Sequence, residues 1–405
     1  MTLQVWLTVL FSASIWAMGY VYFGYPLLLR LGFFGRQQPL RLAAMSGEQP
    51  MISIIIAAHN EEAGIEAKLR NLLASKYPRE RMEILVGSDG SSDRTEAIVH
   101  PLAAEGVGLI SFPQHQGKSA MQNRLVAAAS GSILVFTDAD CLLSPDALNR
   151  LVENFRDPRI GLVTGRPAYL NRADTQITAN ESIYLDYETW LREQESARGI
   201  LAMASGSLFA VRRSLWKSLD RHVGDDFALP LHVGRSGFRN VLEICAIATT
   251  HLTQNTPSAM LRLKVRIVSK DFRALLAQPA LLNPFRAGRL ALGLWSHKIL
   301  RWFVPYFLIA TFVTSVTLSA QPVFRAIAAL QCAFYVIALA GLLQRRVEFR
   351  APWSIPASFC LVNLAALLGT LKCFAGHTSG QWEPERAQSL GTSVSENSAA
   401  FLESK

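Results

Sequence analysis

The sequence predicts an α/β domain, built on a parallel sheet, that is anchored in a membrane by one N-terminal and about three C-terminal helices. Three observations lead to this prediction. Short runs of β-branched and apolar residues alternate with helical patterns between residues 51 and 140. Four long apolar segments lie outside that region. Polar clusters with acidic residues follow three of the predicted strands, at the edge where sheets of this kind bind ligands.

Strands and helices are expected in strict alternation. The segment 62–75 has Ile65, Leu69, Leu72 and Leu73 on one face, which indicates a helix that covers a sheet. Strands separated by helices at this spacing form a parallel sheet with helices on both faces. In chain order the expected elements are strand 51–58, helix 62–75, strand 83–87, helix 93–104, strand 107–112, helix 118–129 and strand 133–136.

The first apolar segment predicts an uncleaved membrane anchor. No side chain between Met1 and Leu29 is charged, and roughly 20 apolar residues are enough to cross a bilayer. A cleavable signal peptide would begin with basic residues and have a shorter apolar core. Further spans are expected at 303–320, 326–343 and 355–371, although buried helices of a soluble protein would also explain these three.

Basic residues beside the spans predict which side of the membrane holds the large middle region. Loops rich in Lys and Arg stay in the cytoplasm. The basic residues in question are Arg30, Arg36 and Arg41 after the first span, and Arg345, Arg346 and Arg350 between the third and fourth. The side of the tail depends on whether the number of spans is even or odd. The expected division is an anchor at 1–30, a linker at 31–49, a cytoplasmic domain at 50–260, basic interfacial helices at 261–302, three spans at 303–375 and a disordered tail at 376–405.

Charge and cysteine content narrow the choice of partners. The net charge is +9, and nine basic residues between Arg262 and Arg301 face the single acid Asp271. Their position next to a span favours anionic lipid head groups or a phosphorylated substrate over nucleic acid. The five cysteines show no paired spacing, so neither a disulfide framework nor a zinc site is expected.

The acidic pair Asp138 and Asp140 follows the buried strand 133–136. Carboxylates at i and i+2 suit Mg²⁺ or Mn²⁺, which prefer oxygen ligands and leave positions for water and phosphate. An Asp-x-Asp pair alone also occurs by chance in loops. Lys118 precedes a helix, where a cation and the helix N-terminus can both face phosphate. A solvated surface lysine is the alternative.

With these clusters in this order, the chain resembles the family 2 glycosyltransferases, inverting nucleotide-sugar enzymes with a Rossmann-like GT-A domain. It is similar above all to their membrane-anchored bacterial branch, which includes exopolysaccharide synthases and N-acetylglucosaminyltransferases. The resemblance covers roughly residues 50–300. The segments that carry it are 54–61, 86–93, 117–119, 138–140, 204–213 and 224–227.

The resemblance implies a donor site and a divalent cation. Asp89 would accept a hydrogen bond from uracil, with Ala57, Asn60 and Glu61 lining the same pocket. The remaining implied donor and metal residues are Asp140 as ligand of Mg²⁺ or Mn²⁺, Asp138 beside it on ribose or a metal-bound water, Lys118 on phosphate, and Arg262, Lys264 and Arg266 on the leaving diphosphate.

The resemblance also implies an acceptor side. Asp226 is the expected general base, which takes the proton of the acceptor hydroxyl, and Asp225 beside it would raise its pKa. Gly206 and Ser207 would lie on the acceptor side. Polymerising relatives carry Gln-x-x-Arg-Trp, and the nearest segment here, 263–267, keeps Arg266 but lacks Gln and Trp. This departure argues against a dedicated polymer-gripping site and against the cellulose and hyaluronan synthases.

The expected function is therefore inverting, metal-dependent transfer from a UDP-sugar to a membrane-associated acceptor at a bacterial inner membrane. The acceptor would be a lipid-linked oligosaccharide or a growing exopolysaccharide, with export or assembly proteins as further partners and no role for nucleic acid. Two alternatives stay open. One is transfer to polyprenyl phosphate or a ceramide-like lipid, and the other is a non-enzymatic export partner with a decayed transferase domain. The sequence does not select the donor sugar.

Overall fold

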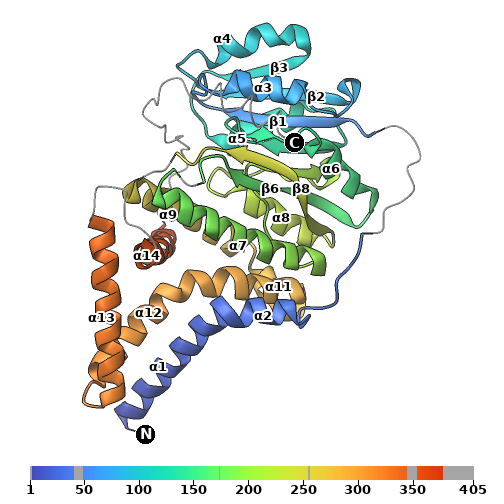
Figure 1. Cartoon of the computed structure of the whole chain (residues 1–405). Coiled ribbons are helices and arrows are strands. Elements are labelled where there is room, and N and C mark those ends of the chain that lie inside the picture. Colours follow the sequence, from blue (N-terminus) through green and yellow to red (C-terminus); the bar gives the residue numbers. More distant parts are fainter. Residues whose placement is uncertain (1, 41–48, 173, 254–255, 344–353, 377–405) are drawn as a thin grey trace.

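The computed structural model describes residues 2–40, 49–172, 174–253, 256–343 and 354–376. A sheet with its covering helices forms one part of the molecule, and a group of long helices extends from it (Figure 1). The strands are β1 Ile52–Ala58, β2 Met82–Asp89, β3 Val107–Phe112, β4 Ile133–Thr137, β5 Leu142–Leu143, β6 Ile160–Tyr169, β7 Leu208–Arg212 and β8 Arg239–Thr250. The helices of the sheet domain are α3 Ile65–Leu73, α4 Thr95–Val99, α5 Lys118–Ala128, α6 Ala147–Glu153, α7 Gln176–Arg198, α8 Asp225–Arg235 and α9 Pro257–Leu276.

The eight strands form one mixed sheet in the order β3-β2-β1-β4-β7-β6-β8-β5. β1 pairs in parallel with both β2 and β4, and β2 pairs in parallel with β3, so the expected alternation is confirmed for residues 52–137. The sheet as a whole is not parallel, because β7 runs antiparallel to both β4 and β6. The parallel arrangement predicted for residues 51–140 is therefore confirmed, and the antiparallel pairs lie beyond β4, where the sequence pattern had assigned no strands.

Alternate residues of the central strand β1 enter two different cores, one on each face of the sheet. Ile54 and Ile56 pack with α3, whose buried residues include Leu69. Ile55 packs on the other face with Met121 of α5. Successive strand side chains point to opposite faces, so a strand buried throughout indicates helices on both sides. This layering brings the first turns of α5 and α8 to the same edge of the sheet as the carboxyl end of β4.

Two predicted helices differ in extent from those in the structure. The helix expected at 62–75 begins at Ile65, because residues 60–64 form a turn in which the Glu61 carbonyl accepts from the amide of Ile65. The helix expected at 93–104 is α4 followed by a 3₁₀ segment, His100–Glu105. Pro101 near the start of that segment lacks the N–H needed to continue an α-helix.

Within the described residues, four helices are long and apolar enough to cross a membrane, one near the N-terminus and three after the sheet domain, as expected. Their extents are Leu3–Arg30, Arg289–Thr317, Pro322–Leu343 and Ser354–Phe374. The labelled helices within them are α1 Leu3–Gly19, α2 Tyr25–Arg30, α11 Arg289–Gly293, α12 Leu300–Thr317, α13 Pro322–Leu343 and α14 Ser354–Phe374, with the short helix α10 Pro284–Ala287 just before α11.

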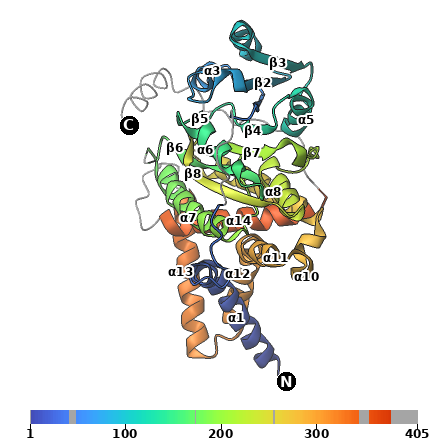
Figure 2. The same ribbon diagram turned by 90° about the vertical axis from the view of Figure 1, so that its right-hand side faces the viewer.

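α14 lies in a different direction from the other three. Figure 1 views α14 almost end-on, and Figure 2 shows it lying across the molecule beneath the sheet domain, whereas α1 and α13 extend away from that domain in both views. α14 packs closely on α9, since a Cβ on Gly369 would lie 2.8 Å from the Val268 side chain. α14 therefore packs against a helix of the sheet domain at Gly369.

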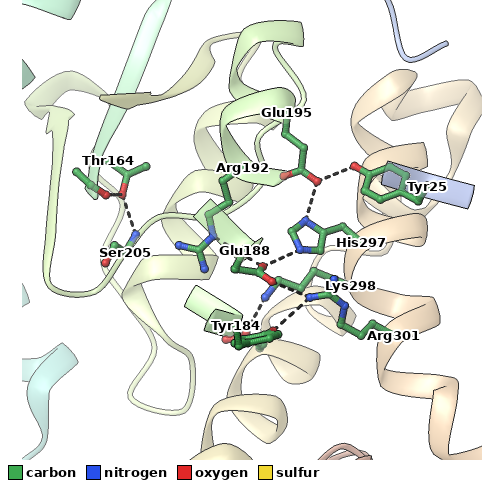
Figure 3. A network of polar contacts seen from close by, with 12 residues as sticks. Tyr25, Thr164, Tyr184, Glu188, Arg192, Glu195, Ser205, His297, Lys298 and Arg301 are labelled. Carbon is green, nitrogen blue, oxygen red and sulfur yellow. Dashed lines mark hydrogen bonds and ion pairs between the residues drawn. The ribbon is translucent and has the colours of Figure 1, made fainter. Parts of the chain in front are cut away.

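A buried polar network joins the membrane helices to the sheet domain (Figure 3). His297 lies between two carboxylates of α7, with Nε2 2.7 Å from Glu188 and Nδ1 2.6 Å from Glu195. Since both ring nitrogens face carboxylate oxygens, the protonated ring fits this arrangement. Arg301 donates to Glu188 at 2.7 Å, and the Tyr25 hydroxyl donates to Glu195 at 2.6 Å. One helix of the sheet domain thus contacts both the first and the second membrane helix.

Interfacial helices with basic residues were expected at 261–302, and two residues near the end of this segment are buried in the structure. His297 is 3% exposed and Trp302 is 5% exposed. The continuous helix starts at Arg289, and its first turns pack on the sheet domain, so these side chains contact protein. Arg41, the basic residues at 345–350 and the tail 377–405 lie outside the described residues.

Candidate active site

Most of the expected site residues meet at one edge of the sheet. Asp89 ends β2, and Asp138 and Asp140 follow β4. Lys118 begins α5, and Asp225 and Asp226 form the first turn of α8. Acidic side chains are favourable at a helix N-terminus, which helps to explain two neighbouring carboxylates there.

Lys118 links the two acidic groups. Its Nζ donates to Asp138 at 2.7 Å and lies 3.4 Å from Asp225. Gln122, one turn further along α5, donates to the same Asp225 oxygen at 2.6 Å. Burial alone would lower the pKa of Lys118, but the carboxylates of Asp138 and Asp225 outweigh it and raise that pKa. Burial opposes ionisation of Asp225 as well, yet Lys118 and Gln122 together lower its pKa.

Asp226 is in a different state from its neighbour. Burial, followed by the charges of Asp225 and Asp271, raises the pKa of Asp226 to about 7. A Cβ on Gly206 would lie 3.5 Å from Asp226 and 3.8 Å from Asp138, so this glycine lies between the two carboxylates. The fold holds Asp226 in place through its carbonyl, which accepts from the Ala204 amide at 2.7 Å. Two adjacent carboxylates with opposite pKa shifts are typical of an acid–base site.

Asp271 of α9 is a member of the cluster that the motif comparison missed. Its Oδ1 lies 3.6 Å from the Cβ position of Gly224, the residue before Asp225. Burial raises the pKa of Asp271 to about 6 against the opposing charge of Lys298, which lies 4.0 Å away. Asp271 is the single acid among nine basic residues at 262–301, and this isolation in the sequence could have identified it as a candidate site residue.

Asp138 and Asp140 fit a divalent cation by the chemistry of their side chains. Ligand atoms of Asp138, Asp140 and Cys141 all lie within 4.8 Å of one another. Burial raises the pKa of the Cys141 thiol well above its usual value, so the two carboxylates are the suitable donors. Asp140 is exposed and accepts from Thr250 at 3.2 Å. Oxygen ligands of this kind favour Mg²⁺ or Mn²⁺.

Lys68 supports the loop that carries these carboxylates. It is fully buried on the apolar face of α3, and its Nζ donates to the Thr137 hydroxyl at 2.8 Å and the Cys141 carbonyl at 2.6 Å. Those two residues bracket Asp138 and Asp140. Burial lowers the pKa of Lys68 to about 8. Its spacing of three residues from Ile65 places it on the buried face, and a lysine on such a face was a signal that could have revealed it.

The expected uracil residues lie together at the ends of β1 and β2. Both carboxylate oxygens of Asp89 are engaged, accepting from the amides of Gln116 at 2.8 Å and Gly117 at 2.7 Å. Asn60 has a positive φ of 57° and its side-chain oxygen accepts from the Ser92 amide at 2.7 Å. Asp89 and Asn60 thus fix the loops around this edge. Ala57 lies in β1 opposite Gly87, and the Glu61 amide donates to Thr95 at 2.7 Å.

Of the basic residues of α9, Lys264 is paired with another helix, whereas Lys270 is near the carboxylate cluster. Lys264 pairs with Glu181 of α7 at 2.9 Å and is thereby held on that helix. Lys270 lies near Arg266, and its ammonium interacts with the charges of Asp225 and Asp226. Lys270 was not among the expected site residues, although it is one turn from Arg266. Arg262 is exposed near the start of α9. Ser207 is buried, and its carbonyl accepts from Thr137 at 2.8 Å.

The fold is that of a GT-A glycosyltransferase. A solved structure of the mannosyltransferase PcManGT from Pyrobaculum calidifontis, in complex with GDP-Man and Mn²⁺, matches with a TM-score of 0.68. The match covers 90% of this chain and 99% of that one, at 21% sequence identity. Likeness at this identity concerns the fold.

The chain belongs to the glycosyl transferase family 2, whose model matches residues 53–219. It is 30% identical over 298 residues to an N-acetylglucosaminyltransferase of Rhizobium meliloti, covering 68% of that protein. It is 32% identical over 173 residues to a beta-monoglucosyldiacylglycerol synthase of Trichormus variabilis and 26% identical over 206 residues to a poly-beta-1,6-N-acetyl-D-glucosamine synthase of Staphylococcus aureus. The matched regions span 37% and 48% of those two relatives. The chain therefore carries a family 2 glycosyltransferase domain.

Proposed function

We propose that this chain transfers a sugar from a UDP-sugar to a membrane-associated acceptor, with inversion at the anomeric carbon. The observation that supports this most strongly is the meeting of Asp138, Asp225 and Asp226 around Lys118 and Gly206. One end of this group carries the Asp138–Asp140 pair, suited to a cation and a diphosphate. The other end carries a carboxylate with a pKa near neutrality, suited to an acceptor hydroxyl.

In this proposal Asp140 and Asp138 hold Mg²⁺ or Mn²⁺. The cation would stabilise the negative charge of the departing UDP as a Lewis acid. Lys118 contributes a second positive charge beside the same carboxylate, positioned for a phosphate oxygen at the start of α5. Arg266 and Lys270 add positive charge from α9. Asp89 acts by holding the loop before Lys118 through two amide hydrogen bonds.

Asp226 is the proposed general base. As the acceptor oxygen bonds to the anomeric carbon, the bond from that carbon to the UDP oxygen breaks on the opposite face. The hydroxyl proton passes to the Asp226 carboxylate. A pKa of about 7 makes that carboxylate a stronger base than an ordinary aspartate while leaving a large ionised fraction at neutral pH.

The relatives suggest which substrates to test first. Two are named for N-acetylglucosamine transfer or polymerisation and one for a glucosylated diacylglycerol. UDP-N-acetylglucosamine and UDP-glucose are therefore the first donors. A growing polysaccharide or lipid-linked oligosaccharide is the preferred acceptor class, and a diacylglycerol or another membrane lipid is the second candidate because of the glucosyldiacylglycerol relative.

The direct test is UDP release by the purified full-length chain over a panel of nucleotide sugars, with and without Mn²⁺. Release that needs both one preferred UDP-sugar and the cation would support the proposal. Labelled product extracted into organic solvent would favour the lipid acceptor, and labelled polymer would favour the polysaccharide. If no donor led to UDP release and UDP did not bind in the presence of Mn²⁺, the result would instead favour a non-enzymatic export partner.

We also propose an arrangement in the membrane. If α1, α12 and α13 cross the bilayer and α14 lies along its surface beneath the sheet domain, the end of α14 is on the same side as the catalytic edge. The basic residues Arg30 and Arg36 after the first span favour the cytoplasm for that side. The catalytic domain would then face the cytoplasm at a bacterial inner membrane, where nucleotide sugars are made.

A further inference from the structure

A cavity lies at the opposite end of β8 from the carboxylate cluster. Its volume is about 400 Å³, within the range of small-molecule sites. The walls come from the end of α8, the start of β8 and residues 280–290 before and within α11. Arg239 begins β8 and Thr250, which contacts Asp140, ends it. The intervening strand spans roughly 35 Å, so this cavity is separate from the proposed catalytic site.

Three arginines line this cavity, namely Arg235, Arg239 and Arg286, and its lining contains no acidic residue. Arg235 and Arg286 are exposed. Neither forms an ion pair with another residue in the described part of the chain. Arg239 is near Asp157 and Arg159, whose opposite charges both act on it. Three guanidinium groups around a lining without acidic residues produce a local positive potential that favours an anion.

Arg239 carries buried hydrogen-bond donors that have no acceptor among the described residues. Its Nη2 donates to the Gln38 carbonyl at 3.0 Å, which fixes the guanidinium. Its Nε and Nη1 are buried without a partner. An unmade buried hydrogen bond costs roughly 1–3 kcal/mol, and more for a charged group. A phosphate group has several acceptor oxygens, and its geometry matches the paired donors of a guanidinium group.

Asn240, the next residue, adds a hydrogen-bond acceptor to the lining of the cavity. Its Nδ2 donates to the carbonyls of Leu201 and Pro230 at 2.8 and 3.0 Å, so the side-chain orientation is fixed. Its Oδ1 is buried and has no partner in the part of the chain that the structure describes. A hydroxyl group beside the phosphate would donate to this oxygen. The cavity therefore combines sites for a phosphate and for a neighbouring alcohol.

The surroundings of the cavity indicate that its ligand comes from the membrane. Phe285, next to Arg286, is 99% exposed. Leu292 and Trp295, in the helix that opens the second candidate span, are 45% and 39% exposed. Exposed aromatic side chains beside arginines are typical of the head-group region of a bilayer.

We propose that this cavity binds the head group of an anionic phospholipid through its phosphate and a hydroxyl, as in phosphatidylglycerol. Binding there would hold the end of α8 and the start of β8 on the membrane surface, at the side of the sheet away from the catalytic edge. A soluble phosphate ester with a hydroxyl has the same chemistry and is the alternative source.

The test uses the full-length chain in detergent, titrated with dihexanoyl-phosphatidylglycerol, dihexanoyl-phosphatidylcholine or glycerol phosphate, with thermal unfolding as the readout. Phosphatidylglycerol is expected to raise Tm and phosphatidylcholine to leave it unchanged. Arg235→Gln/Arg286→Gln should weaken phosphatidylglycerol binding at least tenfold. The control Arg124→Gln/Arg221→Gln removes two exposed arginines outside the cavity lining and should bind as the unmodified chain does.

A charge-neutral variant separates binding in the cavity from general electrostatic attraction. Ala287→Phe fills part of the cavity and leaves all three arginines, and it should also lose binding tenfold or more. Equal loss in the control double variant, or undiminished binding in Arg235→Gln/Arg286→Gln, would overturn the proposal. If glycerol phosphate bound as tightly as phosphatidylglycerol, with the same dependence on the variants, the lipid assignment would be wrong.

Discussion

At the scale of single residues, the site contains neighbouring carboxylates whose pKa values differ because their surroundings differ. Asp225 contacts Lys118 and Gln122, and its pKa is lowered. Asp226, the next residue, has a pKa raised to about 7 by burial and by the charges of Asp225 and Asp271. The same residue type thus has two states in adjacent positions, because Lys118 and Gln122 contact the Asp225 carboxylate directly, whereas burial and the charges of Asp225 and Asp271 outweigh the charge of Lys118 at Asp226.

The raised pKa of Asp226 predicts the pH dependence of transfer. If Asp226 is the base, only its ionised form is active, so kcat/KM should rise about tenfold per pH unit below pH 7 and level off above it. Asp226→Asn should lower transfer by roughly 10²–10⁴-fold at pH 8. A kcat/KM that is flat from pH 5 to 8 in the unmodified chain would contradict this role.

The same shift predicts an opposite effect on stability. A carboxyl whose pKa is raised from 3.8 to about 7 stabilises the folded state in its neutral form, and this contribution is lost as pH rises through about 7. Asp226→Asn stays neutral throughout. Its stability advantage over the unmodified chain, measured by thermal or denaturant unfolding, should widen by roughly 2 kcal/mol between pH 5 and pH 8. A constant difference would show that Asp226 has an ordinary pKa.

Lys68 is expected to act on the site by positioning the loop of Asp138 and Asp140. Lys68→Met keeps the length and apolar stem but removes the hydrogen bonds to Thr137 and Cys141. Loss of such supporting contacts typically costs 10–100-fold in metal affinity or activity. Titration with Mn²⁺ should show this weakening, and Lys76→Met, on an exposed lysine, should not. Mn²⁺ affinity within twofold of the unmodified chain would exclude this role.

At the scale of elements, α7 is the connection between the sheet domain and the membrane helices. Glu188 and Glu195 of this helix contact side chains from α12, from the π-helical segment Leu294–Ile299 before it and from α2. The same segment reaches the site, because Lys298, next to His297, lies 4.0 Å from Asp271. The contacts of the membrane helices therefore continue to a residue beside the proposed base.

Removing one member of this network should be costly. Glu188→Ala leaves His297 and Arg301 buried without a shared carboxylate, and breaking a buried pair in this way costs about 3–5 kcal/mol. The variant should unfold at a clearly lower temperature in detergent than the unmodified chain. Glu193→Ala, on an exposed position of the same helix, is the matched control and should unfold with the unmodified chain. Equal Tm values for both variants would contradict the role of the network.

The sequence pattern predicted the elements of residues 52–137 closely, because each strand there is buried on both faces and each helix has one apolar face. It did not predict β7, whose antiparallel pairing depends on contacts with β4 and β6 that are distant along the chain. The motifs located Asp138, Asp140, Asp225 and Asp226. They missed Lys68, Lys270 and Asp271, since these reach the site only through the packing of α3 and α9.

At the scale of the whole molecule, the proposed arrangement in the membrane makes α14 the decisive helix. Its length and composition suit a membrane span, but it packs on α9 and lies across the direction of α1 and α13 (Figure 2). Composition alone did not distinguish these two situations, because a helix held between protein and lipid is as apolar as one that crosses.

Cysteine labelling tests this arrangement. In a cysteine-free background, Ala375→Cys at the end of α14 should react with a membrane-impermeant reagent only after the cytoplasmic face is opened. Ala320→Cys, between α12 and α13, should react from the outside of intact cells. Both positions are exposed. Labelling of both from the outside would show that α14 crosses the membrane.

The central claim is that Asp140 and Asp226 serve two steps around one cation-bound nucleotide. Calorimetric titration of UDP with Mn²⁺ into the full-length Asp140→Ala and Asp226→Ala variants tests it most directly. We predict that Asp140→Ala loses Mn²⁺-dependent UDP binding by a hundredfold or more, whereas Asp226→Ala binds UDP as the unmodified chain does. Unchanged Mn²⁺-dependent binding in Asp140→Ala would contradict the claim, as would its loss in the folded Asp226→Ala variant.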